Sequence, residues 1–132
     1  MAVSPVLADS SFYITTMRQK QDPLKALAVA GATRDLAICG VVRCEVGRAL
    51  KHENTLKKFQ QIWDVMINVP TDNRLWAQVE HLLWKLDREG VTISLTDAVI
   101  ACCAIRIDAV VLSYDADFWR IPGVRVIRQL DY

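Results

Sequence analysis

The 132-residue sequence lacks the marks of several protein classes. No apolar run reaches the roughly 18 residues that a membrane-spanning helix needs. The first residues contain no basic segment, and Asp9 interrupts their apolar stretch, so we expect no signal peptide. Internal repeats and low-complexity linkers are absent as well. With 52% hydrophobic and 23% charged residues, the sequence predicts one globular domain over residues 1–132, located in the cytoplasm and not bound to a membrane.

The usual cysteine patterns of zinc sites are also missing. Zinc ligands usually come as closely spaced pairs, such as two Cys separated by two residues. Cys39 and Cys44 have four residues between them, and Cys102 and Cys103 are adjacent, so that they would point in different directions on a helix. Both histidines lie far from either pair of cysteines. All four cysteines stand among apolar residues, which predicts buried structural thiols without disulfides in a reducing compartment.

The sequence has no large excess of basic residues, since its net charge is only +1. The charge of the remaining surface is more positive if four of the 15 acids are gathered in one metal-binding pocket. The remaining 11 acids would then face 16 Lys and Arg residues, which leaves +5 for the rest of the surface. A basic surface around such a pocket would suit a polyanionic substrate.

Continuously apolar runs and helical periodicities alternate along the chain. We expect strands at 5–8, 36–40, 109–113 and 124–127, a brief extended piece at 91–94, and a break in the pattern at 68–70. We expect helices from Ser10 or Ser11 onward and at 23–32, 41–51, 53–66, 71–90 and 96–107. Apolar strands that alternate with helices favour a parallel sheet covered on both faces. The expected fold is therefore a three-layer α/β/α fold.

Acidic residues stand where such a fold binds ligands, at the carboxyl ends of its strands. Asp9 and Asp115 lie just past the ends of two predicted strands, and Asp97 opens a predicted helix. Carboxylates held close together raise one another's pKa unless a cation neutralises them. Oxygen ligands without His or Cys suit Mg²⁺ or Mn²⁺, ions that support hydrolysis of phosphate esters.

Each acid also has an ordinary structural interpretation. Asp9 could cap the first helix, and the spacing of Ser94 and Asp97 is that of a capping box. Asp115 and Asp117 could be turn residues. Glu45 lies within a largely apolar helix, where an unpaired carboxylate would be costly. The residues alone leave both interpretations open.

Four segments resemble, in order and spacing, the motifs of PIN-domain proteins, and in particular the VapC toxin ribonucleases of bacterial toxin–antitoxin pairs. They are VLADSS at 6–11, VRCEVG at 42–47, LTDAVIA at 95–101, and LSYDADF at 112–118 followed by IPGV at 121–124. The resemblance covers the chain from 6 to 127. Each motif is weak alone, but four in this order are fairly specific. Ser10 and Ser113 depart from the family by replacing the commoner Thr, and both keep the hydroxyl group.

The resemblance implies a PIN-like fold and a metal-dependent endoribonuclease that forms a homodimer and is inhibited by an antitoxin protein. It implies that the catalytic and metal-binding acids are Asp9, Glu45, Asp97 and Asp115. Asp117 would contribute to a second metal or to metal-bound water. Ser10 or Ser11, together with Ser113, would orient the carboxylates or the metal-bound water.

Other residues are open to two interpretations. Arg43 and Arg48 flank Glu45, and each could contact a substrate phosphate or be a solvated or ion-paired arginine. Trp63 and Trp76 share apolar helix faces, which favours core or interface packing over base stacking. Trp84 lies off the apolar face of its helix and could mark a partner surface. The segment 17–34 departs from the strand–helix rhythm and is a candidate for antitoxin or substrate contacts.

Three other functions compete with a toxin ribonuclease. One is a PIN-type nuclease that processes RNA or cleaves DNA without an antitoxin. Another is a Mg²⁺-binding receiver domain, which would need adjacent acids after the first strand and a late Lys, where this chain has Ser10, Ser11 and Arg128. A non-catalytic RNA-binding relative is the last, and the full set of acids argues against it.

Overall fold

The computed structural model describes residues 3–130 and forms a five-stranded, wholly parallel sheet in the order β3-β2-β1-β4-β5. The strands are β1 (Val6–Ala8), β2 (Leu36–Cys39), β3 (Ile67–Val69), β4 (Val110–Leu112) and β5 (Arg125–Ile127). The helices are α1 (Ser10–Arg18), α2 (Pro23–Gly31), α3 (Gly40–Ala49), α4 (Glu53–Asp64), α5 (Asn73–Arg88) and α6 (Leu95–Arg106), with a 3₁₀ helix η1 (Ala116–Arg120).

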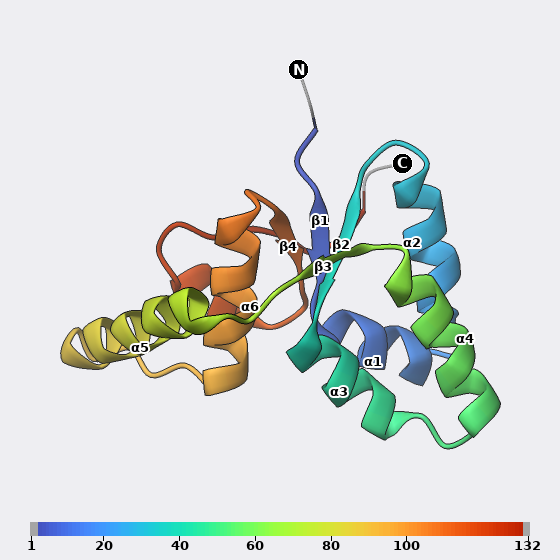
Figure 1. Ribbon diagram of the computed structural model, residues 1–132, viewed down its shortest axis with the longest axis horizontal. Helices are drawn as coiled ribbons and strands as arrows, with labels where there is room; N and C mark the ends of the chain where they lie inside the picture. The colour runs from blue at the N-terminus through green and yellow to red at the C-terminus, as the bar shows by residue number, and fades with distance from the viewer. Residues whose placement is uncertain (1–2, 131–132) are drawn as a thin grey trace.

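Helices cover both faces of the sheet. Figure 1 shows α5 and α6 on one side of the strands and α1 to α4 on the other. The predicted three-layer α/β/α fold is thus confirmed. No helix in the described part of the chain combines the length and the apolar character needed to cross a membrane.

The central strands are apolar because both of their faces are covered. All three residues of β1 and all three of β4 are buried, and Leu7 pairs with Val111 on one side and with Ala37 on the other. Parallel strands end at the same edge of a sheet, so the residues after β1, β2 and β4 meet there. This edge carries the acids.

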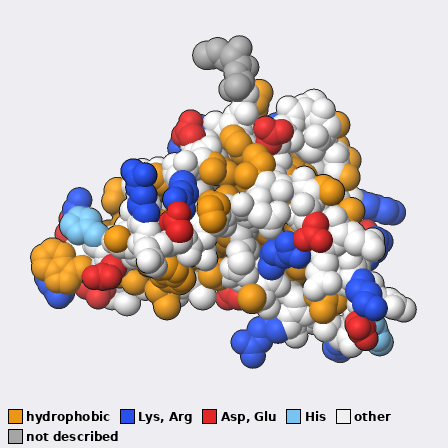
Figure 2. Space-filling model, in the orientation of Figure 1, with side chains coloured by type: hydrophobic (Ala, Val, Ile, Leu, Met, Phe, Trp, Pro, Cys, Tyr) orange, Lys and Arg blue, Asp and Glu red, His pale blue; other side chains and the backbone are white. Residues whose placement is uncertain are grey.

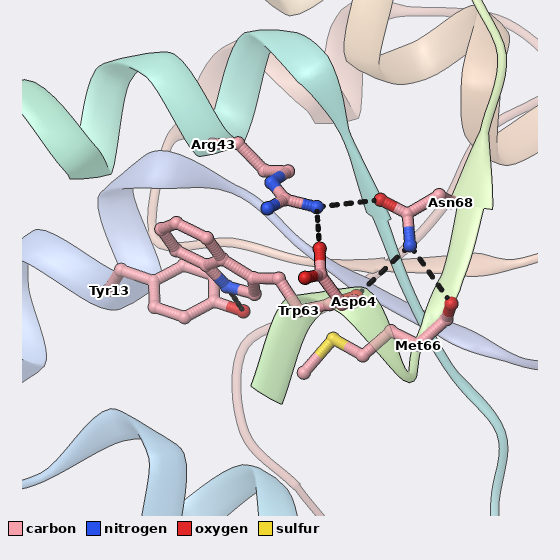
Figure 3. A network of polar contacts seen from close by, with 6 residues as sticks. All are labelled: Tyr13, Arg43, Trp63, Asp64, Met66 and Asn68. Atoms are coloured by element: carbon pink, nitrogen blue, oxygen red, sulfur yellow. Dashed lines mark hydrogen bonds and ion pairs between the residues drawn. The ribbon is translucent and has the colours of Figure 1, made fainter. Parts of the chain in front are cut away.

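An aromatic cluster fastens α1 to α4 on one face of the sheet. Tyr13, Phe59 and Trp63 pack with ring centroids 5.5 to 6.5 Å apart. The indole Nε1 of buried Trp63 donates a hydrogen bond to the Tyr13 hydroxyl at 3.2 Å (Figure 3). The expected core packing of Trp63 is confirmed, whereas Trp76 remains 42% exposed.

Several local predictions were wrong. The break expected at 68–70 overlaps β3, an edge strand whose Ile67 and Asn68 are exposed and which pairs with β2. A three-residue strand buried at one position carries too little apolar signal to be recognised. Cys44 is exposed, contrary to the expectation of a buried thiol, because it lies on the outer face of α3. All four cysteines, which fall within the described residues, are free thiols.

Helix α5 ends as predicted but begins differently. Gly90 has a φ of +78°, the left-handed conformation that commonly ends a helix. At the other end, the helix expected from residue 71 begins at Asn73 and is capped by Asp72, whose carboxylate accepts a hydrogen bond from the Leu75 amide at 3.0 Å. The piece expected to be extended at 91–94 forms no strand.

Candidate metal centre

Asp9 follows β1 directly and is almost completely enclosed, with 2% of its surface exposed. Its Oδ1 accepts hydrogen bonds from the Phe12 amide at 3.0 Å and from the Ser11 hydroxyl at 2.8 Å. Its Oδ2 accepts a hydrogen bond from the buried Ser113 hydroxyl at 2.6 Å. Burial raises the pKa of Asp9, while these three donors oppose the rise. The carboxylate is therefore held in one orientation at the edge of the sheet.

Three further acids converge on the same edge. Asp97 comes from the first turn of α6, while Asp115 and Asp117 follow β4 and open η1. Each offers a carboxylate oxygen, and these atoms all lie within 4.8 Å of one another. All three side chains are half-buried. The arrangement joins two segments that the sequence separates by a complete helix and strand.

The four acids influence one another electrostatically. Burial, together with the negative charges of Asp115, Asp9 and Asp117, raises the pKa of Asp97 to about 7. Asp115 also raises the pKa of Asp9. Like charges this close destabilise one another's ionised forms, which is the condition that a bound cation would relieve.

Glu45 reaches the edge from α3, the helix that begins directly after β2. Its Oε1 accepts a hydrogen bond from the Ser10 hydroxyl at 2.5 Å. Ser10 and Ser11 therefore have separate partners, Glu45 and Asp9 respectively, where the sequence left open which serine orients an acid. Ser113 joins Asp9 to the next segment, because its Oγ also accepts a hydrogen bond from the Asp115 amide at 2.9 Å.

The structural interpretations of these acids hold too, but they account for only part of the arrangement. Asp9 caps α1, Asp115 caps η1, and the Asp97 amide donates to Ser94 Oγ at 3.1 Å. Capping explains one hydrogen bond at each residue and does not explain why separate segments bring their acids together.

Asp72 gives the contrast, since it caps α5 but is also ion-paired with Arg106 at 2.7 Å. Hydrogen bonding to Arg106 lowers the pKa of Asp72 to about 2. Within residues 3–130, Asp9, Asp97 and Asp115 have no such basic partner. Their excess negative charge is uncompensated by the chain, unlike that of an ordinary capping acid.

Arg43 is engaged away from the acids. Its Nη1 donates to Asp64 at 2.9 Å and to Asn68 at 3.1 Å, and its guanidinium lies 5.4 Å from the centroid of the Trp63 ring (Figure 3). This is the ion-paired alternative of the two that the sequence allowed. Arg48 is exposed, and a substrate contact for it stays a prediction.

Arg120 was not among the site residues predicted from the sequence. Its Nη1 lies 3.4 Å from Asp117 Oδ1 and 3.5 Å from the carbonyl oxygen of Thr92, so it ties η1 to the loop before α6. The detectable signal was an acid and an arginine three residues apart at the start of a short helix. Among residues 3–130, Arg120 is the basic residue that forms an ion pair with the acidic group, and it does so through Asp117.

The donor set fits a hard divalent cation. The atoms that converge are carboxylate oxygens, supported by serine hydroxyl groups, and they include no His or Cys side chain. Mg²⁺ and Mn²⁺ prefer such ligands, whereas zinc sites are usually built from Cys and His.

Comparison with known proteins gives a consistent result. A family profile for the PIN domain matches residues 6–124, which is most of the chain. No curated protein matches the sequence significantly. PIN domains are generally metal-dependent nucleases that use divalent cations.

Solved structures share the fold at low sequence identity. The DNA-bound VapBC complex of Salmonella typhimurium contains a chain that is 20% identical, with a TM-score of 0.77 over 95% of this chain and 98% of that one. VapBC-1 of nontypeable Haemophilus influenzae has 16% identity and a TM-score of 0.75 over 93% and 96%. VapC20 of Mycobacterium tuberculosis, described as a toxin that cleaves the sarcin–ricin loop, has 15% identity and a TM-score of 0.62 over 91% and 98%. The family match and the shared fold confirm the resemblance seen in the sequence: this chain belongs to the PIN-domain family.

Proposed function

We propose that the chain is a Mg²⁺- or Mn²⁺-dependent endoribonuclease and the toxin of a toxin–antitoxin pair. The observation that carries the catalytic part is the convergence of Asp97, Asp115 and Asp117 within 4.8 Å, beside buried Asp9. Arg120 contacts Asp117, but Asp9, Asp97 and Asp115 have no basic partner among the described residues, so most of this negative charge is uncompensated. Such charge is stabilised by a divalent cation, and PIN domains generally use one.

In this proposal Asp9, Glu45, Asp97 and Asp115 hold the cation, and Asp117 contributes to a second ion or to bound water. When bound, the cation lowers the pKa of a water molecule and neutralises charge on the phosphodiester. The serines have positioning roles: Ser11 and Ser113 fix the Asp9 carboxylate, and Ser10 fixes Glu45. Prepositioned carboxylates need no rearrangement when charge develops in the transition state.

RNA as the substrate and a toxin role are supported by the structural neighbours. VapBC complexes from several bacteria share the fold, and one neighbour, VapC20, is described as cleaving the sarcin–ricin loop. On this basis we infer a cognate antitoxin partner, a homodimeric assembly and a cytoplasmic location for this chain. Cleavage of DNA, or RNA processing without an antitoxin, would be the alternative outcome of the tests below.

The catalytic proposal is tested by cleavage of end-labelled RNA and DNA with Mg²⁺, with Mn²⁺ and with a chelator. We expect RNA cleavage that requires metal and is lost in Asp9→Asn and Asp97→Asn. Asp87→Asn, which removes an exposed acid from α5, is the matched control and should cleave normally. RNA cleavage that survives chelation, or that is equal in Asp97→Asn and Asp87→Asn, would contradict the metal-site assignment.

The toxin role needs a separate experiment in cells. Induced expression of the chain should arrest growth, and Asp97→Asn should not. Co-expression of the protein encoded by the adjacent gene should restore growth and co-purify with the chain. Growth unaffected by an active nuclease would favour the RNA-processing alternative.

A further inference from the structure

We propose that the groove between α1 and α3, lined by Ile14, Met17, Arg18, Ala49 and Lys51, binds the sugar–phosphate backbone of single-stranded RNA on one side of the cleaved bond. We call it the α1–α3 groove. It has a volume of about 490 Å³. This inference rests on the proposed ribonuclease function, and it assigns the surface along which the substrate approaches the acids.

The groove leads away from the acidic centre. The hydrogen bond between Ser10 and Glu45 joins the two helices at the end nearest Asp9. Helical periodicity places Ile14 and Arg18 on the same face of α1 as Ser10, and Ala49 on the same face of α3 as Glu45. Arg18 lies eight residues beyond Ser10, which corresponds to about 12 Å along the helix axis. A strand held at the acids can therefore continue along this groove.

Basic residues without ion-pair partners surround the far end of the groove. Arg18, Arg48 and Lys51 have no ion-pair partner among the described residues. Further along the chain, Lys58 has no ion-pair partner among the described residues either, whereas Lys57 is paired with Glu53 at 3.6 Å. Figure 2 shows Lys and Arg side chains in this region, where α3 and α4 meet in Figure 1.

Outside the groove, Arg74, Arg88 and Arg128 also lack an ion-pair partner among the described residues, but three other arginines are held by carboxylates. Arg43, Arg106 and Arg125 contact Asp64, Asp72 and Asp108 at 2.7 to 3.0 Å. Arg18 and Lys51 differ from them because their charges face solvent without a carboxylate. A polyanion is the partner that such unpaired charges attract, and the acidic centre would otherwise repel it.

The floor of the groove suits the remainder of a nucleotide. Ile14 and Met17 are half-buried and form an apolar floor between the basic side chains at its edge. Proteins that bind single strands combine a positively charged groove with apolar or aromatic contacts to sugars and bases. Phosphates at Arg18 and Lys51 and sugars on Ile14 and Met17 would satisfy both parts of the surface.

The experiment measures binding of a fluorescent single-stranded oligoribonucleotide of about 12 nucleotides by anisotropy, with Asp97→Asn in every protein so that turnover does not interfere. Arg18→Glu/Lys51→Glu reverses the two groove charges. Arg74→Glu/Lys85→Glu makes the same change in charge on exposed residues of α5, on the opposite side of the molecule, and is the matched control. Arg18→Gln/Lys51→Gln removes the charges without reversing them, and thermal unfolding confirms that each variant is folded.

We expect the groove reversal to weaken binding roughly tenfold or more, the neutral variant to lie between, and the α5 control to change little. The slope of log affinity against log salt should fall by about 1.4 in magnitude for the neutral variant, since each phosphate contact contributes about 0.7 with single strands. Equal losses in the groove and α5 variants, or an unchanged salt slope, would overturn the proposal. A groove that binds an antitoxin segment instead of RNA would give one of these two results.

Cleavage by the same variants in the active background separates the two proposals. Arg18→Gln/Lys51→Gln should raise KM with little change in kcat, because backbone contacts are made equally in the ground and transition states. If the native chain cleaves no RNA while the groove variants still lose binding, the ribonuclease proposal fails and the groove assignment stands. If cleavage is normal in kcat and KM for all variants, the groove assignment fails alone.

Discussion

Removing the Ser113 hydroxyl should destabilise the protein more than any other single-atom change near the acids. Ser113 is completely buried, and its Oγ donates to Asp9 Oδ2 at 2.6 Å and accepts from the Asp115 amide at 2.9 Å. The Ser11 hydroxyl also lies 3.2 Å from Ser113 Oγ, so Ser113→Ala removes a partner from three polar groups and adds no bulk. The hydroxyl links the residue after β1 with the segment after β4, so its loss also loosens the centre.

The magnitude follows mainly from the lost hydrogen bonds to the Asp9 carboxylate and the Asp115 amide, because Ser11 keeps its hydrogen bond to Asp9. A hydrogen bond to a charged carboxylate contributes about 1.5–3 kcal/mol, and leaving a partly buried amide unsatisfied costs about 1 kcal/mol or more. The expected loss is thus about 2–4 kcal/mol near neutral pH. For a chain of this length each kcal/mol lowers the unfolding temperature by roughly 3–5 °C.

The loss should depend on pH with a definite sign. The Ser113 hydrogen bond opposes the rise in the pKa of Asp9, so removing it raises that pKa further. A carboxyl group whose folded pKa is raised loses stability as pH increases from its unfolded value through its folded value. The difference between Ser113→Ala and the native chain should therefore grow with pH across this window and shrink below it.

Urea unfolding in chelator, at several pH values, measures this effect, and Ser10→Ala is the control. Ser10 also donates to a carboxylate, but Glu45 is half-buried and Ser10 Oγ accepts from no backbone amide in the described structure, so the loss should be about 1 kcal/mol or less. A Ser113→Ala loss that equals the Ser10→Ala loss, or that is the same at every pH, would refute the reasoning. It would mean that the small cavity, rather than the Asp9 carboxylate, sets the cost.

Three further predictions concern stability. Since the pKa of Asp97 is raised to about 7, the metal-free chain should lose stability as pH increases from about 4 to 7, by at most roughly 4 kcal/mol, and Asp97→Asn should remove most of this dependence in urea unfolding. Adding Mn²⁺ at a pH of about 7.5 should raise the unfolding temperature of the native chain and of Asp87→Asn but not of Asp9→Asn. An equal rise in all three proteins would indicate non-specific binding. Tyr13→Phe should cost about 1–3 kcal/mol, because the buried Trp63 indole loses its acceptor, and an unchanged urea midpoint would show that this hydrogen bond adds nothing.

The sequence determined the layout of the fold because buried positions are occupied by apolar residues whose spacing follows the period of the helix or strand. Continuous apolar runs at β1 and β4 and helical periodicity in α5 indicated covered parallel strands and their crossover helices. Since parallel strands end at one edge, the positions of Asp9, Asp97 and Asp115 in the chain were enough to place them together. Topology alone accounts for this part of the candidate site.

The tertiary structure decided everything that depends on which residues become neighbours. The Ser10–Glu45 bond spans 35 residues and the Ser113–Asp9 bond spans 104, and no local pattern records either pairing. The sequence likewise left open whether Arg43 contacts a substrate phosphate or an acid of the chain, and the folded structure shows the ion pair with Asp64. Periodicity reports whether a side chain is covered and not what covers it.

The acids illustrate both contributions. Their residue types, their order and their places after strands came from the sequence, as did the expectation that they attract a hard cation. The approach of Asp97, Asp115 and Asp117 to within 4.8 Å, the burial of Asp9 and the raised pKa of Asp97 came from tertiary packing. Electrostatic interaction falls with distance and with exposure to water, and both quantities exist only in the folded chain.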